Sequence, residues 1–379
     1  AGPAEFKVGF SENELAGACL ALSDGERTGY LVSVRSDAPQ GFAEALRARI
    51  AAERSCDPEC VLVVGERTRV APKLTDFVPN LFSKGVVAAD DPALQPLVDA
   101  ARRAADDLKP AEILVGRSVV KVDDGVAEDN VRKLRFARAD GDLEVVDTTE
   151  ASGFPSLVCR RAVSSRGEFF RPQAAGEVRG WTKTFATPLR KVPTPEVTPD
   201  LPADLERMRL LADKPEAAPV VASALFVGKT VAFVGLSGVP MVELCRRIRW
   251  ESPLVTTLVG GSVGVGVGYL YDYGTWPDEG YPSLSTCFTQ RGIERIVREI
   301  SRVCAVANRA ASGIDFAQAA ADAPAKWISG ATDAPESPAP VLCRTFTLAD
   351  RPQKAVFEVA VAGWCEVYVN GRRIGTDVL

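Results

Sequence analysis

The sequence predicts an α/β fold, with mixed β-sheets and flanking helices in a main domain, followed by an incomplete β-sandwich segment. Three observations carry this prediction. Short β-rich runs alternate with amphipathic helical stretches over residues 1–315. Residues 316–340 are dominated by Ala, Pro, Asp and Ser, which is typical of an interdomain linker. Residues 341–379 then alternate apolar and polar side chains, as strands do.

The N-terminal part begins with three predicted strands. They are expected at Phe6–Phe10, Ala18–Leu22 and Gly29–Val34, and Asp24-Gly25 is a turn signal between the last two. These runs are short and rich in β-branched and aromatic side chains or small apolar ones, and turn residues bound them. We therefore expect a small antiparallel unit at the start of the chain.

Helices and strands alternate after it. Pro39 is expected to open a helix, and a second helix is expected from about Pro92 to Leu108. Between them, Val61–Val64 is an aliphatic run of the length of a buried strand. In the first helix the spacing puts one apolar set on a single face, namely Phe42, Leu46 and Ile50.

The middle of the chain has a β pattern. Strands are predicted at Ile113–Val122, Val131–Ala137 and Leu143–Val146, the last one after the turn at 139–141. Residues 188–202 include five prolines, so an extended linker or edge is expected there, followed by a helix near 204–212.

The second half of the main domain returns to mixed elements. Strands are predicted at Val220–Val227, Thr230–Leu236 and Leu254–Val259, with a helix at Val242–Trp250. A long amphipathic helix is expected at Gly292–Ala311. Its inward face should consist of Ile293, Ile296, Val297, Ile300 and Val303.

Composition excludes several function classes. The 379 residues include no histidine, so Ser/His/Asp and Cys/His catalytic arrangements are impossible. The net charge of −5 argues against nucleic acid or an anionic membrane as the main partner, and no apolar run is long enough to span a bilayer. Nine cysteines are too few for a disulfide scaffold, and most are expected in the core. The compartment stays open.

The glycine-rich run at 260–268 matches neither a P-loop nor a dinucleotide fingerprint. Its glycines alternate with valine, and no Lys-Ser/Thr ending follows. We interpret it as a close backbone approach or an irregular strand rather than a phosphate site.

Four stretches in order resemble the catalytic domain of the neutral/alkaline non-lysosomal ceramidase family. They are Leu15–Asp37, Val61–Pro72, Leu134–Pro155 and Val234–Pro240, followed by Gly280-Tyr281. Where the family has Thr-His-Thr-His-Ser-Gly-Pro, this chain has Thr68-Arg69-Val70-Ala71-Pro72 after Glu66-Arg67. The resemblance implies the fold of a zinc amidohydrolase that releases a fatty acid from an N-acyl lipid.

The same resemblance implies that the zinc site is lost. The family holds zinc with a histidine of the Thr-His motif, the histidine before proline, a glutamate after Pro-Gly and a late tyrosine. The matching positions here are Arg67 or Arg69, Phe154, Val239 and Tyr281. Because guanidinium, phenyl and isopropyl groups offer no lone pair to a metal, only Tyr281 remains as a ligand, and neither a metal nor another cofactor is expected.

Arg67 and Arg69 suggest what could replace the metal. Two guanidinium groups lining one pocket would suit a carboxylate, sulfate or phosphate of an anionic small molecule, lipid or glycan. The alternative, which we favour on sequence grounds, is that both arginines pair with local acids such as Glu66 or Asp76.

The C-terminal tail resembles the accessory β-sandwich of α-L-rhamnosidases. The likeness rests on residues 344–348, 355–362 and 366–375, with Asn370-Gly371 as a type I′ hairpin signal. About 40 residues cannot cover the apolar face of a sandwich. We therefore expect the module to be incomplete in this chain.

Three functional hypotheses follow. The first is a degenerate ceramidase-like domain that binds or scaffolds without metal-dependent hydrolysis. The second is an active hydrolase on a lipid or glycan substrate, whose catalytic residues the sequence does not reveal. The third is an interaction subunit in which side chains such as Phe154 fill the former cleft.

Overall fold

The computed structural model describes most of the chain in eleven segments, and two compact units divide it at residues 312 and 313. The segments are 5–35, 41–65, 90–121, 127–148, 156–162, 169–189, 217–262, 269–272, 288–310, 364–370 and 372–378. Within them, no helix is long and apolar enough to cross a bilayer.

The first sheet of unit 1, sheet A, has the strand order β4-β3-β2-β1-β5. The β1–β2–β3 meander is antiparallel, and β4 joins β3 in parallel after the helix α1, as in a β–α–β crossover. The three predicted N-terminal strands, the turn and the buried strand at residue 61 are confirmed. The strands are β1 Lys7–Asn13, β2 Gly17–Ser23, β3 Thr28–Val34, β4 Val61–Gly65 and β5 Lys109–Pro110.

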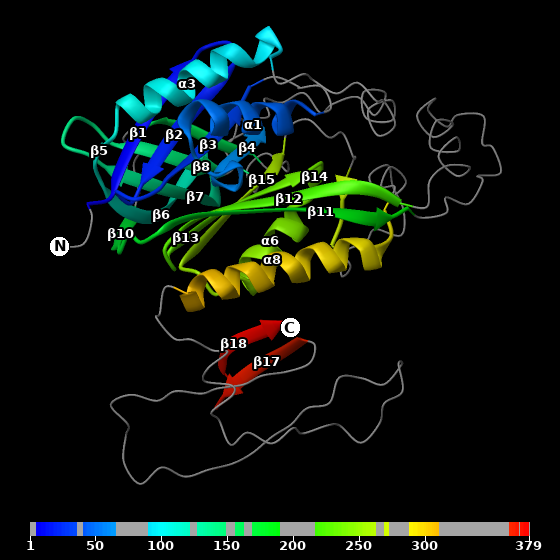
Figure 1. Ribbon diagram of the computed structural model, residues 1–379. Helices are drawn as coiled ribbons and strands as arrows, with labels where there is room; N and C mark the ends of the chain where they lie inside the picture. Colours follow the sequence, from blue (N-terminus) through cyan, green and yellow to red (C-terminus); the bar gives the residue numbers. More distant parts are fainter. Residues whose placement is uncertain are drawn as a thin grey trace, which may run out of the picture. The chain divides into compact units, whose positions relative to one another are not determined.

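Two helices cover the outer face of sheet A (Figure 1). They are α1, Phe42–Arg54, and α3, Gln95–Asp106. The helix predicted from Pro39 begins at Phe42, because Gly41 adopts φ 80° at its N-cap, and Pro39 itself lies outside the described residues. Phe42, Leu46 and Ile50 are buried as predicted.

Sheet B is antiparallel and has the order β10-β6-β7-β8-β9. The turn at 139–141 and the three strands predicted around it are confirmed. The last two strands of the sheet, β9 and β10, were not predicted from the sequence. The strands are β6 Glu112–Lys121, β7 Ala127–Ala137, β8 Leu143–Asp147, β9 Leu157–Arg161 and β10 Phe169–Gln173.

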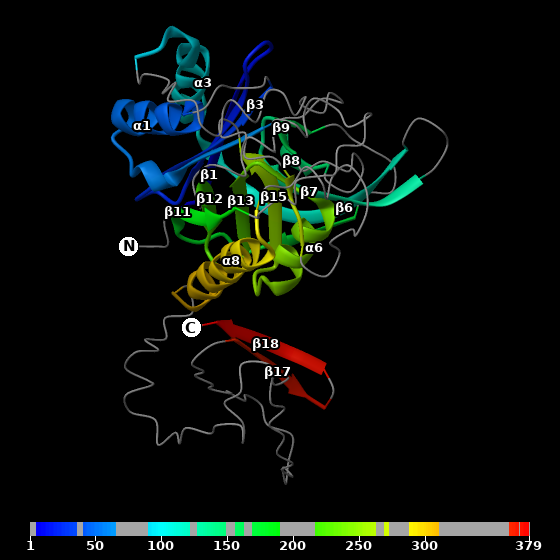
Figure 2. The ribbon, with the colours of Figure 1, turned by 90° about the vertical axis from the view of Figure 1, so that its right-hand side faces the viewer.

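Sheet C has the order β11-β12-β13-β15, with β13 and β15 parallel. Its strands are β11 Val178–Pro188, β12 Ala217–Val227, β13 Val231–Ser237 and β15 Thr256–Ser262. Two helices, α6 Val242–Glu251 and α8 Gln290–Ala310, cover its outer face side by side (Figures 1 and 2). The inward face predicted for α8 is confirmed, since its five apolar residues are all buried.

The core of unit 1 lies in three apolar layers between these elements. One lies between sheet A and its helices, one between sheet C and its helices. The central layer joins the inner faces of all three sheets, with members such as Leu62 of sheet A, Phe136 of sheet B and Phe233 of sheet C. Unit 1 is therefore an α/β fold with helix, sheet, sheet and helix layers, which agrees with the predicted class.

The described part of unit 2 is a single hairpin. Its strands β17, Trp364–Val369, and β18, Arg372–Val378, are antiparallel, and Val369 pairs with Arg372 across a two-residue turn. Asn370 has φ 50°, which is the left-handed conformation that a type I′ turn requires. The predicted hairpin is confirmed. The strands expected at 344–348 and 355–361 lie outside the described residues.

Candidate functional site

The strands β4, β13 and β15 end near one another, where sheet A packs on sheet C. Gly235 of β13 pairs with Gly260 of β15. A methyl group on Gly260 would lie 3.0 Å from Cγ of Leu157 and 3.4 Å from Cγ1 of Val64, and one on Gly235 would lie 2.9 Å from Cδ1 of Leu62. The side chains of β4 and β9 therefore pack closely against the backbone at both glycines, and a methyl group at either position would require a neighbouring leucine to shift.

We call this place the strand-end junction, defined by Val64, Leu157, Gly235 and Gly260. The glycine run predicted as a close backbone approach or an irregular strand begins here, and at Gly260 the neighbouring atoms belong to the side chains of Leu157 and Val64. Residues 263–268 lie outside the described part.

The sequence-predicted site residues relate to this junction in different ways. Val239 lies in the short strand β14, Val239–Pro240, which pairs in parallel with β16, Tyr269–Leu270. The Val239 side chain is 1% exposed and belongs to the apolar core under α6 and α8. The other four positions, Arg67, Arg69, Phe154 and Tyr281, lie outside the described residues.

A buried ion pair stands beside the junction. Asp147 is the last residue of β8 and pairs in register with Leu157. Its Oδ2 lies 2.6 Å from Nη2 of Arg249 on α6, and it accepts a longer bond of 3.5 Å from the amide of Val259. The two side chains are 1% and 3% exposed. This pair links sheets B and C to α6.

Sequence reasoning missed this pair. Asp147 follows the apolar run of β8, and Arg249 lies between the buried Ile248 and the exposed Trp250. A charged residue beside apolar ones was a local signal that each side chain is buried. No local pattern, however, indicates that two residues about a hundred positions apart form a pair.

Arg247 forms a second polar cluster next to the segment that follows β16. Its guanidinium binds Glu251 at 2.8 Å, Asp272 at 2.9 Å and both carboxylate oxygens of Glu294. Burial disfavours its charge, but the hydrogen bonds that Arg247 donates to these carboxylates outweigh burial and raise its pKa. Arg247 is therefore a fixed cation that joins α6, α8 and Asp272.

Glu144 forms the centre of a third cluster, on the face of sheet B that points away from the core. It is completely buried and faces three cations, Lys133 at 3.8 Å, Arg135 at 3.4 Å and Arg160 at 2.7 Å. The guanidinium of Arg135 also stacks over the ring of Phe170, 4.1 Å from its centroid. The carboxylate of Glu144 pairs with cations on neighbouring strands, and such cross-strand pairs stabilise a sheet. We therefore interpret this cluster as a set of structural ion pairs.

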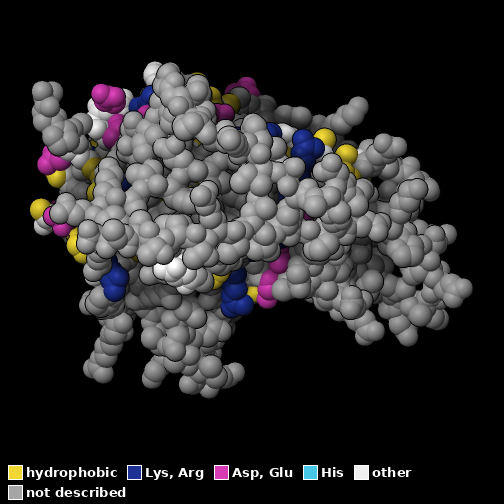
Figure 3. Space-filling model, turned by 90° about the horizontal axis from the view of Figure 1, so that it is seen from below, with side chains coloured by type: hydrophobic (Ala, Val, Ile, Leu, Met, Phe, Trp, Pro, Cys, Tyr) yellow, Lys and Arg dark blue, Asp and Glu magenta, His cyan; other side chains and the backbone are white. Residues whose placement is uncertain are grey.

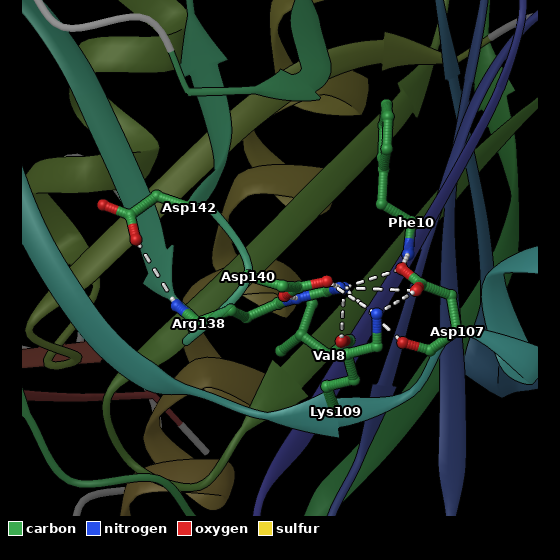
Figure 4. A network of polar contacts seen from close by, with 7 residues as sticks. All are labelled: Val8, Phe10, Asp107, Lys109, Arg138, Asp140 and Asp142. Carbon is green, nitrogen blue, oxygen red and sulfur yellow. Dashed lines mark hydrogen bonds and ion pairs between the residues drawn. The ribbon is translucent and has the colours of Figure 1, made fainter.

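The largest polar network joins sheet A to sheet B (Figure 4). The Arg138 guanidinium lies 2.7 Å from Asp107 and 2.6 Å from Asp140, while Nζ of Lys109 binds both carboxylates, at 3.0 and 2.6 Å. Arg138 also donates to the carbonyl of Val8. Every charge has an opposite partner, so this network ties the elements together and has no free acid or base.

The described thiols are poor nucleophiles. Burial raises the pKa of Cys56 to about 11 and that of Cys304 to about 12, so both stay protonated at neutral pH. Five of the six described cysteines are buried, as predicted from sequence. The described residues also contain no group of three or more Cys, Asp or Glu side chains that could hold a metal ion.

The comparisons with known proteins concern the fold. The sequence matches no protein-family model and no curated protein. The structure is similar to that of neutral ceramidase from Pseudomonas aeruginosa, with a TM-score of 0.50 and 12% identity over 82% of this chain and 72% of that one. A ceramidase complexed with C2 aligns with a TM-score of 0.49 and 10% identity, over 80% of this chain and 75% of that one. The chain thus has a fold similar to that of the neutral ceramidase from Pseudomonas aeruginosa.

Proposed function

We propose that this chain is a degenerate relative of zinc-dependent N-acyl amide hydrolases, which acts as a binding or scaffolding domain without metal-dependent hydrolysis. One combination of observations carries the proposal. The fold resembles that of a neutral ceramidase, yet none of the 379 residues is a histidine.

The residues present do not fit a catalytic zinc ion. Protein zinc is held by Cys, His, Asp or Glu donors, and catalytic sites use three of them with one open position. This chain lacks imidazole, and Val239 replaces a carboxylate with an isopropyl group that packs in an apolar core. A divalent cation there would lose its hydration without gaining ligands. No catalytic step is therefore assigned to a metal.

The strand-end junction supports the alignment of the lost ligand positions. Arg67 follows Gly65 by two residues, Phe154 precedes Ser156 by two and Val239 follows Ser237 by two. Gly65 and Ser156 are adjacent to Val64 and Leu157 of the junction, and Ser237 lies two residues after Gly235.

The proposed ligand is an anion. Arg67 and Arg69 would bind a carboxylate, sulfate or phosphate through paired N–H donors. In the alternative that we favour on sequence grounds, both arginines pair with local acids such as Glu66 or Asp76. In the separate interaction-subunit hypothesis, side chains such as Phe154 fill the former cleft. The burial of Val239 in the core favours this interaction-subunit alternative.

Hydrolysis of a fluorogenic N-acyl amide, with and without added zinc, tests the loss of activity. We expect no turnover above background under either condition, with the Pseudomonas neutral ceramidase as the positive control. Turnover that appears with zinc and disappears with a chelator would contradict the proposal, while zinc-independent turnover would favour the active-hydrolase alternative.

Anion binding is tested with the double variant Arg67→Gln/Arg69→Gln. Sulfate or a short fatty acid should raise the unfolding temperature of the parent chain but not that of the variant. The matched control is Arg27→Gln/Arg102→Gln, which removes the same charge from exposed pairs. Equal shifts in all three proteins would favour the filled cleft.

A further inference from the structure

We propose that the outer face of α8, together with the C-terminal end of α6, is a docking surface for an anionic phospholipid bilayer. This inference rests on exposed residues of the two helices and is independent of the lost metal positions.

The outer face of α8 carries a row of arginines. Arg291, Arg295, Arg298 and Arg302 follow each other at spacings of four, three and four residues, which places them on one side of the helix. The row is about 16 Å long at 1.5 Å per residue. The first three are exposed, Arg302 is 38% exposed, and the exposed Val306 extends the row by one turn.

Two of the four positive charges in this row are not balanced by a nearby carboxylate among the described residues. Arg298 pairs with Glu294 and Arg302 with Glu299. Arg291 and Arg295 have no ion-pair partner among the residues that the structure describes. The helix contains five arginines against two glutamates in a chain whose net charge is −5. The positive charge is therefore concentrated on one element.

The opposite side of α8 is fixed in the core, so the arginine row must face away from sheet C. Ile293, Ile296 and Ile300 are at most 3% exposed. The helix therefore cannot turn its apolar side towards lipid, and binding would use the folded surface as it stands.

The neighbouring helix adds an aromatic side chain to this layer. Glu294 and Ser301 of α8 contact Arg247 and Glu251 of α6, so the two helices run side by side on the same sheet face. Trp250 at the end of α6 is 69% exposed, and Val255 after it is 55% exposed. Figure 3 views the molecule from the side on which α8 lies and shows basic, acidic and hydrophobic side chains at separate places on this face.

This combination favours a bilayer over a soluble polyanion. Tryptophan concentrates at membrane–water interfaces, and each Lys or Arg near an anionic surface contributes about 1 kcal/mol, or about fivefold in affinity.

Co-sedimentation of the full chain with vesicles tests the proposal. We expect binding to phosphatidylglycerol/phosphatidylcholine vesicles, weakening at high salt, and little binding to pure phosphatidylcholine. Arg291→Gln/Arg295→Gln should lower the partition coefficient by about 25-fold, from the contribution of two arginines. Its folding should be unaffected, because neither side chain has an ion pair to lose.

A matched control separates the surface from the overall charge. Arg27→Gln/Arg102→Gln removes the same two charges elsewhere and should keep the parent's partition coefficient. In addition, a blue shift of tryptophan emission on vesicle binding should be smaller in Trp250→Phe. The proposal is overturned if the parent chain ignores anionic vesicles, or if both double variants lose binding equally.

Discussion

At the residue scale, Arg138 shows how one buried cation can hold three segments together. Its side chain is fully buried, and it joins the carbonyl of Val8 in β1, Asp107 after α3 and Asp140 in the turn before β8. A buried charge is costly unless it is paired. The buried guanidinium of Arg138 therefore requires its carboxylate and carbonyl partners for the fold to be stable.

Arg138→Met should lower the free energy of unfolding by about 2–3 kcal/mol, because the buried cation is lost and Asp107 and Asp140 keep Lys109 as their one cationic partner among the described residues, beside the amide of Phe10 at Asp107. Chemical denaturation measures the change. The control is Arg102→Met, which removes an exposed i,i+3 pair with Asp99 and should cost less than about 0.5 kcal/mol. Similar losses of unfolding free energy in both variants would show that the network of Figure 4 stabilises the fold no more than an exposed ion pair does.

The Asp147–Arg249 pair gives a second test at this scale. Asp147→Asn should destabilise the chain by about 3 kcal/mol, since Arg249 would remain charged and buried without its carboxylate. Glu177→Gln, which removes solvent-accessible pairs with Arg27 and Arg179, serves as the control and should have only a small effect. If Asp147→Asn is as stable as the parent, the pair does not hold the strand-end junction.

At the element scale, the sequence predicted the elements with strong local patterns and missed those defined by tertiary contacts. The three N-terminal strands and the long helix α8 follow from periodicity alone. The strand β11 escaped notice because it alternates polar and apolar residues imperfectly, as in Thr182-Lys183-Thr184, and is stabilised by pairing with β12 along its whole length. Long-range pairing of this kind leaves no local signature.

The candidate site was predictable only in part, for the same reason. The resemblance implies that Val239 occupies a former ligand position, and its place in an apolar core depends on α6 and α8, which pack over it from later in the chain. The convergence of β4, β9, β13 and β15 likewise depends on how the sheets stack, which no single motif specifies.

The variant Gly180→Ala tests how closely β11 packs against the backbone at Glu59. A methyl group on Gly180 would lie 1.9 Å from the carbonyl oxygen of Glu59, so two backbone segments would have to separate. We expect a loss of at least about 2 kcal/mol in unfolding free energy. Gly235→Ala is the graded control, because its methyl group meets only the movable end of Leu62, at 2.9 Å. A smaller loss for Gly180→Ala than for Gly235→Ala would contradict this packing.

At the scale of the whole molecule, the absence of histidine determines the response to pH. Hydrogen bonds from Arg138 and Lys109 depress the pKa of Asp140, and they outweigh burial to depress that of Asp107. A hydrogen bond from Arg302, together with Lys183, lowers the pKa of Glu299 to about 2. Carboxylates with depressed pKa values stabilise the fold above their unfolded pKa of about 4 and lose this effect as the pH falls.

The unfolding temperature should therefore be nearly constant between about pH 6 and 8 and should fall below about pH 4. Calorimetry across this range measures it. A marked change between pH 6 and 7 would contradict the expectation, because no side chain of this chain with an ordinary pKa titrates there.

The central claim is that a ceramidase-like fold persists here without its metal. Elemental analysis of the full chain, purified from zinc-supplemented medium and dialysed without chelator, tests it most directly. We expect zinc far below one ion per chain and an unfolding temperature that a chelator does not change. Stoichiometric zinc, whose removal lowers the unfolding temperature, would contradict the claim.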